Sequence, residues 1–336
     1  MSSHEDNIKK EFEESEGIID TKAEVETKTN DDGNITNLGK VDTTRGSGIT
    51  SIDDPEIQRI QSLTGYIKLD LSVFPSGGQF YRDDFQLHIR AARVGEIREF
   101  STLDEENILD VDEKLNSLLV NCTKIMYGTQ RGSYRDVLEE DRIYLILCIR
   151  ELTFKEGENK LMMPVGKTKC KTGTCKSQEA VELRTDSLQF NEADELLEKY
   201  YDATNKCFTV PTKNHGEIVI APPTLGVMRS VTDWIRQREE QNKPWDKSSL
   251  AILPYIQREW RGFKDKEIFS AITSFQGWDS SKYSIIYRLV EKAKIGVKPE
   301  FNYPCDSCGE EVTVPLTFPG GIKALFIIQD ISAELL

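Results

Sequence analysis

Cys305-Asp306-Ser307-Cys308-Gly309 has the spacing of a zinc knuckle and is the strongest chemical signal in the sequence. Two thiolates three residues apart can bind one metal ion if the chain turns sharply, and a glycine after them permits that turn. The run Val312-Thr313-Val314 that follows reads as a strand, which is typical of a zinc ribbon. Alone, the pair is ambiguous because a C-x-x-C motif also serves thiol redox chemistry.

A second cysteine pair strengthens the zinc interpretation, because it also lies beside a glycine and ahead of a strand-like run, 181–183. We predict one structural zinc site whose ligands come from both pairs: Cys170, Cys175, Cys305 and Cys308. Four protein ligands leave no open position, so such a site would not be catalytic. Two unrelated pairs, or a redox role for the second pair, are the alternatives. A redox role lacks the βαβ setting of a thioredoxin.

The distance between the two pairs predicts an insertion. The sequence places 129 residues between Cys175 and Cys305, whereas compact ribbons have about 15–20 there. Residues 191–297 carry mainly helical patterns, with a strand pair expected within 207–220. The expected helices are 192–201, 224–240, 249–260, 266–275 and 283–295. We therefore expect a zinc-ribbon-like β portion interrupted by a mainly helical insertion.

The segment before the first pair predicts a β-hairpin followed by helices. Residues 66–71 and 85–90 alternate as strands do, and Gly77 and Gly78 supply turn chemistry between them. Helical stripes follow from Val94 and over 109–125, with Asp112 as the expected cap of the second helix. Residues 137–150 read as a third helix or a buried strand, and their charged start favours the helix. Residues 324–328 read as a strand near the end.

The fold class predicted from these patterns is α+β, and the chain is divided into four parts. They are a disordered acidic tail over 1–54, a hairpin and helix segment with the first half-site over 55–186, the helical insertion over 187–297, and a β-rich second half-site over 298–336. Residues 1–55 hold fourteen acidic and six basic residues, and too little apolar surface to offset the entropy of ordering.

Composition excludes several classes of protein. The formal charge of −14 is unlike that of a phosphate-backbone binder, so nucleic acid is an unexpected partner. The longest apolar run, 143–149, is far short of the ~20 residues of a membrane span. No signal peptide is visible. Cys122, Cys148 and Cys207 read as small core residues, with a spare metal ligand as the alternative for Cys207. His88 and His215 lack the surroundings of a general base, and residues 166–168 lack the rest of a P-loop. We expect neither an enzyme nor a small-molecule substrate.

Several short motifs follow one another along the chain. They are Phe74-Pro75-Ser76-Gly77-Gly78-Gln79-Phe80-Tyr81, Leu87-His88-Ile89-Arg90, Val94-Gly95-Glu96-Ile97, the helical 115–125, Asp141-Arg142-Ile143-Tyr144-Leu145, Ile149-Arg150-Glu151, and the two cysteine pairs. Their order resembles the T4-type bacteriophage baseplate hub protein family. The resemblance covers residues 55–185 and 297–330. This chain departs from the family in its wider first cysteine spacing, its insertion and its N-terminal extension.

The resemblance implies a non-enzymatic hub component, or a factor that assembles the hub of a contractile tail. Its partners would be other phage baseplate hub and tail proteins. It would act in the cytoplasm of an infected bacterium or in the virion tail baseplate. The alternative is a zinc-ribbon adaptor of nucleic-acid machinery, since Lys167, Lys169, Lys171 and Lys176 flank the first cysteine pair. A thiol enzyme using Cys305 and Cys308 is a third hypothesis.

Overall fold

The computed structural model describes residues 65–154, 159–165, 180–256, 270–271, 273–274, 276–305, 308–318 and 320–327. The predicted acidic tail, 1–54, lies outside these ranges, as do Cys170, Cys175 and the P-loop-like residues 166–168. Helices and antiparallel strands alternate along the described chain, which confirms the α+β prediction. No described helix combines the length and apolar character needed to cross a membrane.

A four-stranded antiparallel sheet forms from β1 (Ile67–Lys68), β2 (Phe85–Ile89), β3 (Thr123–Tyr127) and β4 (Gln130–Arg131), in that order. The predicted pairing of the first two strands is confirmed, with Ile67 opposite Ile89. Their connection is longer than a tight hairpin turn, because it contains a 3-10 helix, η1 (Leu71–Val73).

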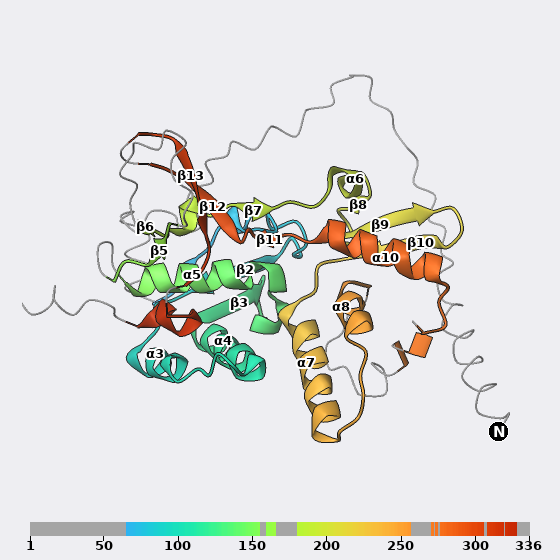
Figure 1. Ribbon diagram of the computed structural model, residues 1–336, viewed down its shortest axis with the longest axis horizontal. Helices are drawn as coiled ribbons and strands as arrows, with labels where there is room; N and C mark the ends of the chain where they lie inside the picture. The colour runs from blue at the N-terminus through green and yellow to red at the C-terminus, as the bar shows by residue number, and fades with distance from the viewer. Residues whose placement is uncertain are drawn as a thin grey trace, which may run out of the picture. The chain divides into compact units, whose positions relative to one another are not determined.

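Three α-helices accompany this sheet: α3 (Val94–Ser101), α4 (Ile108–Cys122) and α5 (Arg142–Thr153) (Figure 1). The helix expected over 109–125 ends at Cys122, because Thr123 begins β3 and pairs with Ile89. Asp112 is not the cap of α4. Asn107 is, since its Oδ1 accepts from the backbone N–H groups of Leu109 and Asp110. The helical interpretation of 137–150 is confirmed by α5.

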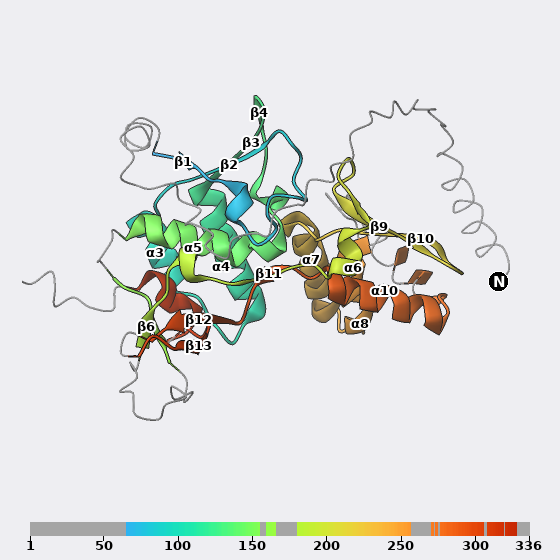
Figure 2. The same cartoon turned by 90° about the horizontal axis from the view of Figure 1, so that it is seen from above.

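Two small ladders carry the segments around the cysteine pairs. They are β5 (Met162–Pro164) with β6 (Ala180–Glu182), and β12 (Glu300–Pro304) with β13 (Glu311–Pro315). They lie beside one another in both views (Figure 1, Figure 2). The strand expected over 324–328 is wrong for the described part. Residues Ile322–Phe326 form a 3-10 helix, η5, and the carboxylate of Glu105 accepts from the Lys323 N–H in its first turn at 3.1 Å.

The region of the predicted insertion begins and ends side by side. Strand β7 (Phe190–Asn191) pairs with β11 (Gly296–Val297), so Asn191 lies opposite Gly296. Between them lie β8 (Tyr201–Asp202), β9 (Cys207–Thr212) and β10 (Gly216–Ile220) in one sheet, with α6 (Glu195–Glu198), α7 (Leu225–Glu240), α8 (Lys247–Ile256) and α10 (Ser280–Ala293). The helix expected over 192–201 is shorter than predicted, because Tyr201 joins β8. The one expected over 266–275 lies mostly outside the described residues.

The buried apolar residues form two main clusters. The first core runs from Ile67 to Leu188 and adds Leu225 and four residues near the C-terminus. Those four are Phe301, Val314, Leu325 and Phe326. The second core lies wholly between Leu197 and Ala293. Cys122, Cys148 and Cys207 are each at most 1% exposed, as the sequence predicted for core cysteines.

Candidate metal centre and acidic junction

The second cysteine pair lies on the turn between β12 and β13. The Gly309 N–H donates to the carbonyl of Cys305 at 2.7 Å, and the Cys305 N–H donates to the carbonyl of Glu310 at 2.8 Å. Gly309 has a φ of +73°, a conformation that favours glycine. Cys305 is 6% exposed, whereas Cys308 is exposed. The turn therefore has the sharp, glycine-assisted form that the knuckle interpretation requires.

The segment with the first cysteine pair starts and ends next to this turn. Val165, the last described residue before it, packs against Cys305 and Val312. Pro164 and Ala180 are Cα partners in the β5–β6 ladder, so the chain leaves and returns at one place. Cys170 and Cys175 themselves are outside the described residues. The grouping of the four cysteines consequently stays a prediction.

The donor set suits zinc. Thiolate sulfur is a preferred ligand of Zn²⁺, and four of them complete a tetrahedron. Within the described ranges, which lack half of the proposed ligands, no group of three or more His, Cys, Asp or Glu is placed to hold a metal ion. Val165, which packs against the cluster of Cys305 and Val312, is the described residue nearest in sequence before the first pair.

The Phe74–Tyr81 motif is tied to a buried aspartate far along the chain. Ser76 donates to Asp141 from both its backbone N–H and its hydroxyl, and the hydroxyl of Tyr81 donates to Oδ2 of Asp141 at 2.8 Å. The Tyr81 oxygen also accepts from the Leu138 N–H at 3.1 Å. Burial raises the pKa of Asp141 to about 6, while these hydrogen bonds work in the opposite direction.

The neighbouring glutamate faces the second core. The hydroxyl of Tyr255, on α8, donates to Oε1 of Glu140 at 2.9 Å. Burial raises the pKa of Glu140 to about 8. Its Oε2 is buried and has no hydrogen-bond partner among the described residues. A carboxylate in such a place is costly, so the neutral acid is favoured at pH 7.

Sequence reasoning missed this site, which we call the acidic junction. It consists of the buried carboxyl groups of Glu140 and Asp141 and the residues that bind them. The run Glu139-Glu140-Asp141 was interpreted only as the charged start of a helix. Acidic residues at a helix start are ordinarily solvated, so no local pattern marked Glu140 and Asp141 as buried.

One constellation of catalytic residue types does form, at the start of α10. Nδ1 of His215 lies 3.9 Å from Oδ2 of Asp279, and its Nε2 lies 3.5 Å from Oγ of Ser281. Both distances exceed a normal hydrogen bond. Asp279 is mostly exposed and already caps α10 through the Lys282 N–H. This arrangement lacks the buried, orienting carboxylate of a Ser-His-Asp triad.

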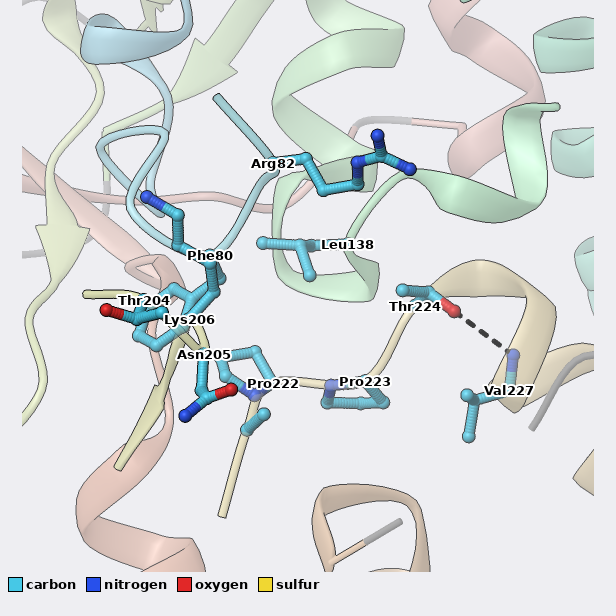
Figure 3. Close-up of a pocket in the computed structure, with 11 residues that line it drawn as sticks. Phe80, Arg82, Leu138, Thr204, Asn205, Lys206, Pro222, Pro223, Thr224 and Val227 are labelled. Atoms are coloured by element: carbon cyan, nitrogen blue, oxygen red, sulfur yellow. Dashed lines mark hydrogen bonds between the residues drawn. The ribbon is translucent and has the colours of Figure 1, made fainter. Parts of the chain in front are cut away.

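A cavity of about 430 Å³ lies beside the acidic junction, between the two cores (Figure 3). Phe80 and Leu138 line it from the first core side, Pro222 and Pro223 from the chain leading into α7, and Val227 from α7 itself. Two cations of the lining are paired, Arg82 with Asp84 at 3.0 Å and Lys206 with Asp83 at 2.7 Å. The lining is mixed, because Thr204, Asn205 and Thr224 add polar groups to the apolar side chains.

Comparison with known proteins adds no relative. No family model, no curated protein and no solved structure matches this chain.

Proposed function

We propose that this chain is a non-enzymatic structural or assembly component of a contractile phage tail baseplate hub. It acts by binding other baseplate hub and tail proteins. A structural zinc ion, held by Cys170, Cys175, Cys305 and Cys308, stabilises the part of the fold that carries this role. The place of action is the cytoplasm of an infected bacterium, or the tail baseplate of the finished particle.

The observation that carries this proposal is the contact between two of the family-like motifs. Ser76 and Tyr81 of the first motif bind Asp141 of the second. The Phe74 ring packs edge-on against Tyr144 with 5.0 Å between ring centroids. Phe74 and Tyr144 are both at most 1% exposed. Motifs that are scattered in sequence but joined in one buried unit are expected when the resemblance reflects a common fold rather than chance.

In this proposal the four-cysteine zinc site has a structural role, because it holds two parts of the fold together. The guanidinium of Arg150, on α5, donates from Nε to the carbonyl of Leu325 at 2.7 Å, which ties the C-terminal part to the first core. Val165 and Cys305 make the second connection. A closed metal site at that point would join the two portions that the region between Asn191 and Gly296 separates in sequence. Zinc binding then contributes directly to folding.

Co-expression with candidate partners tests the proposal. The full chain is expressed with each tail or baseplate protein encoded by the neighbouring reading frames, and the mixture is analysed by size-exclusion chromatography with light scattering. We expect co-elution with at least one of them at about 150 mM salt, and no binding of DNA or RNA at that salt concentration.

Two results would contradict it. If no neighbouring frame encodes a tail protein, the family resemblance fails. If the chain binds nucleic acid with an affinity that falls steeply between about 50 and 200 mM salt, the nucleic-acid adaptor becomes the better assignment.

A further inference from the structure

The two cores meet beside the acidic junction, where residues 137–139 contact residues 223–225. We call this set of contacts between the cores the junction. Leu138 forms an antiparallel bridge with Thr224. The Glu139 N–H donates to the carbonyl of Pro223 at 3.0 Å, and the Leu225 N–H donates to the carbonyl of Val137 at 2.7 Å. Each of these joins the segment before α5 to the chain that enters α7, whose first residue, Leu225, still packs in the first core.

Side chains add polar contacts across the same place. Tyr255 donates to Glu140, and Arg229 of α7 lies 3.6 Å from Asp112 of α4. Asp112 also accepts from Arg142 at 2.7 Å. One aromatic contact also crosses here, since Phe80 packs edge-on against Phe208 of the second core with 5.3 Å between ring centroids. The cavity of about 430 Å³ lies beside that contact. Polar contacts beside a cavity hold two cores together less firmly than continuous apolar packing would.

Among the residues that the structure describes, no cation is placed against the carboxyl group of Glu140. On its own 3-10 helix, η3 (Glu139–Asp141), both neighbours are acidic. From α8, Glu140 faces the hydroxyl group of Tyr255. The negative charge of Glu291 on α10 also raises the pKa of Tyr255. From β11, Glu140 faces Gly296, whose Cβ position would lie 3.8 Å from that of Glu140. The nearest cation of α5, Arg142, is paired with Asp112 and Glu139.

We propose that the junction is a proton-controlled hinge, in which Glu140 holds a proton while the two cores are joined and releases it when they part. Rising pH therefore favours the open junction. Opening exposes the carboxyl group to water and separates it from Tyr255. The first core keeps its own carboxylate, Asp141, because the donors to that residue, Ser76 and Tyr81, belong to the same core.

The direction of the pH dependence follows from the linkage between proton binding and opening of the junction. In the joined state the pKa of Glu140 is raised to about 8 by burial, and in water it returns to about 4.3. Between these values the joined state binds one proton that the open state has lost, so opening becomes about tenfold more favourable per pH unit. Above pH 8 the effect levels off, because both states are ionised.

Native-state hydrogen exchange on the full chain tests the hinge. The Glu139 amide reports opening, since its hydrogen bond to the carbonyl of Pro223 lies at the junction. After correction for intrinsic exchange chemistry, we expect its opening equilibrium to rise by about tenfold per pH unit from pH 6.5 to 7.5. Glu140→Gln should make it flat over that range. The control Glu217→Gln, at an exposed position of β10, should leave the rise intact.

A second measurement needs no variant. Carboxyl-detected NMR of the wild-type chain with labelled glutamate should show one side chain that titrates near pH 8. Equal pH dependence in wild type and Glu140→Gln would overturn the hinge, and so would glutamates that all titrate below about pH 6. The hinge stands independently of the proposed hub function, because neither measurement involves a partner.

Discussion

Ser76 holds Asp141 at both carboxylate oxygens, with its N–H donating to Oδ1 at 2.9 Å and its hydroxyl donating to Oδ2 at 2.6 Å. Asp141 is fully buried, so its removal leaves these donors without a partner. We expect Asp141→Ala to lower the free energy of unfolding by about 3 kcal/mol, measured by urea denaturation. The control Asp84→Ala, at an exposed aspartate paired with Arg82, should stay within about 0.5 kcal/mol of wild type. Equal effects of the two substitutions would remove the structural role given to the Phe74–Tyr81 motif.

Metal content tests the four-cysteine site. By the proposed stoichiometry we expect about one zinc per chain in protein purified without chelators, and a lower melting temperature after chelation. Substituting Cys170 or Cys308 with serine should each abolish zinc binding, because a closed tetrahedral site needs every ligand. Cys207→Ala is the matched control, since Cys207 is buried against Thr209 and should leave the zinc content unchanged. Full zinc content in the Cys170→Ser variant would show that the pairs do not share a metal ion.

Glu96 is expected to stabilise the fold more as the pH rises, whereas Glu140 is expected to stabilise the closed junction less as the pH rises. The carboxylate of Glu96 is held by Arg90 at 2.5 Å, and this hydrogen bond lowers its pKa to about 2. A lowered carboxyl pKa contributes stability that is present above the unfolded value near pH 4.5 and lost as the pH falls towards 2. We expect Glu96→Gln to cost up to about 3 kcal/mol at pH 7 and much less near pH 2. Glu113→Gln, on the exposed face of α4, should show no such difference in the same denaturation series.

Two glycines, Gly132 and Gly95, should respond in opposite ways to replacement by alanine. A Cβ at Gly132 would lie 2.6 Å from Cγ2 of Ile125 and 2.8 Å from the ring of Tyr127. Gly132→Ala is therefore expected to destabilise the chain by about 1–3 kcal/mol. A Cβ at Gly95, in α3, would meet nothing within 4 Å. Gly95→Ala should be neutral or stabilising by up to about 1 kcal/mol, because alanine favours the helix. Thermal unfolding of the pair separates steric from conformational effects.

The β7–β11 ladder predicts that the region it encloses can be removed. Asn191 and Gly296 are opposite each other, so joining them directly would place an Asn-Gly turn at the end of the ladder. A variant without residues 192–295 should keep cooperative unfolding and its zinc content. A deletion of equal length shifted to 182–285 removes β7 and should not fold. Failure of both variants to fold would mean that the first core depends on the second.

Local patterns in the sequence predicted most of the elements but not all of their ends. The apolar stripe of α4 continues in phase to Ile125, yet Thr123–Tyr127 pairs with Phe85–Ile89. Tertiary pairing there overrides the helical period. The run at 324–328 is apolar and short, and periodicity cannot separate strand from helix in such a run. This segment forms a 3-10 helix instead of a strand, and in that helix Phe326 packs against Phe100 of α3.

The candidate metal site was predictable in part and the junction was not. The spacing of Cys305 and Cys308 identifies them as candidate metal ligands, because both lie on one turn. Glu140 and Tyr255 are 115 positions apart, and no local pattern relates them. The raised pKa of Glu140 results from burial by residues of another core, so it exists only in the folded chain.

The arrangement of the two cores also fixes an order of events during synthesis. Ribosomes add about 5–20 residues per second, and domains generally fold as units while the chain emerges. The second core is complete once Ala293 has emerged, whereas the first core waits for Phe301, Val314 and Phe326. The N-terminal portion of the first core must therefore persist unfinished while the enclosed region folds. During that interval Phe100 lacks the ring of Phe326 that packs against it, and such exposed apolar surface is what chaperones bind on nascent chains.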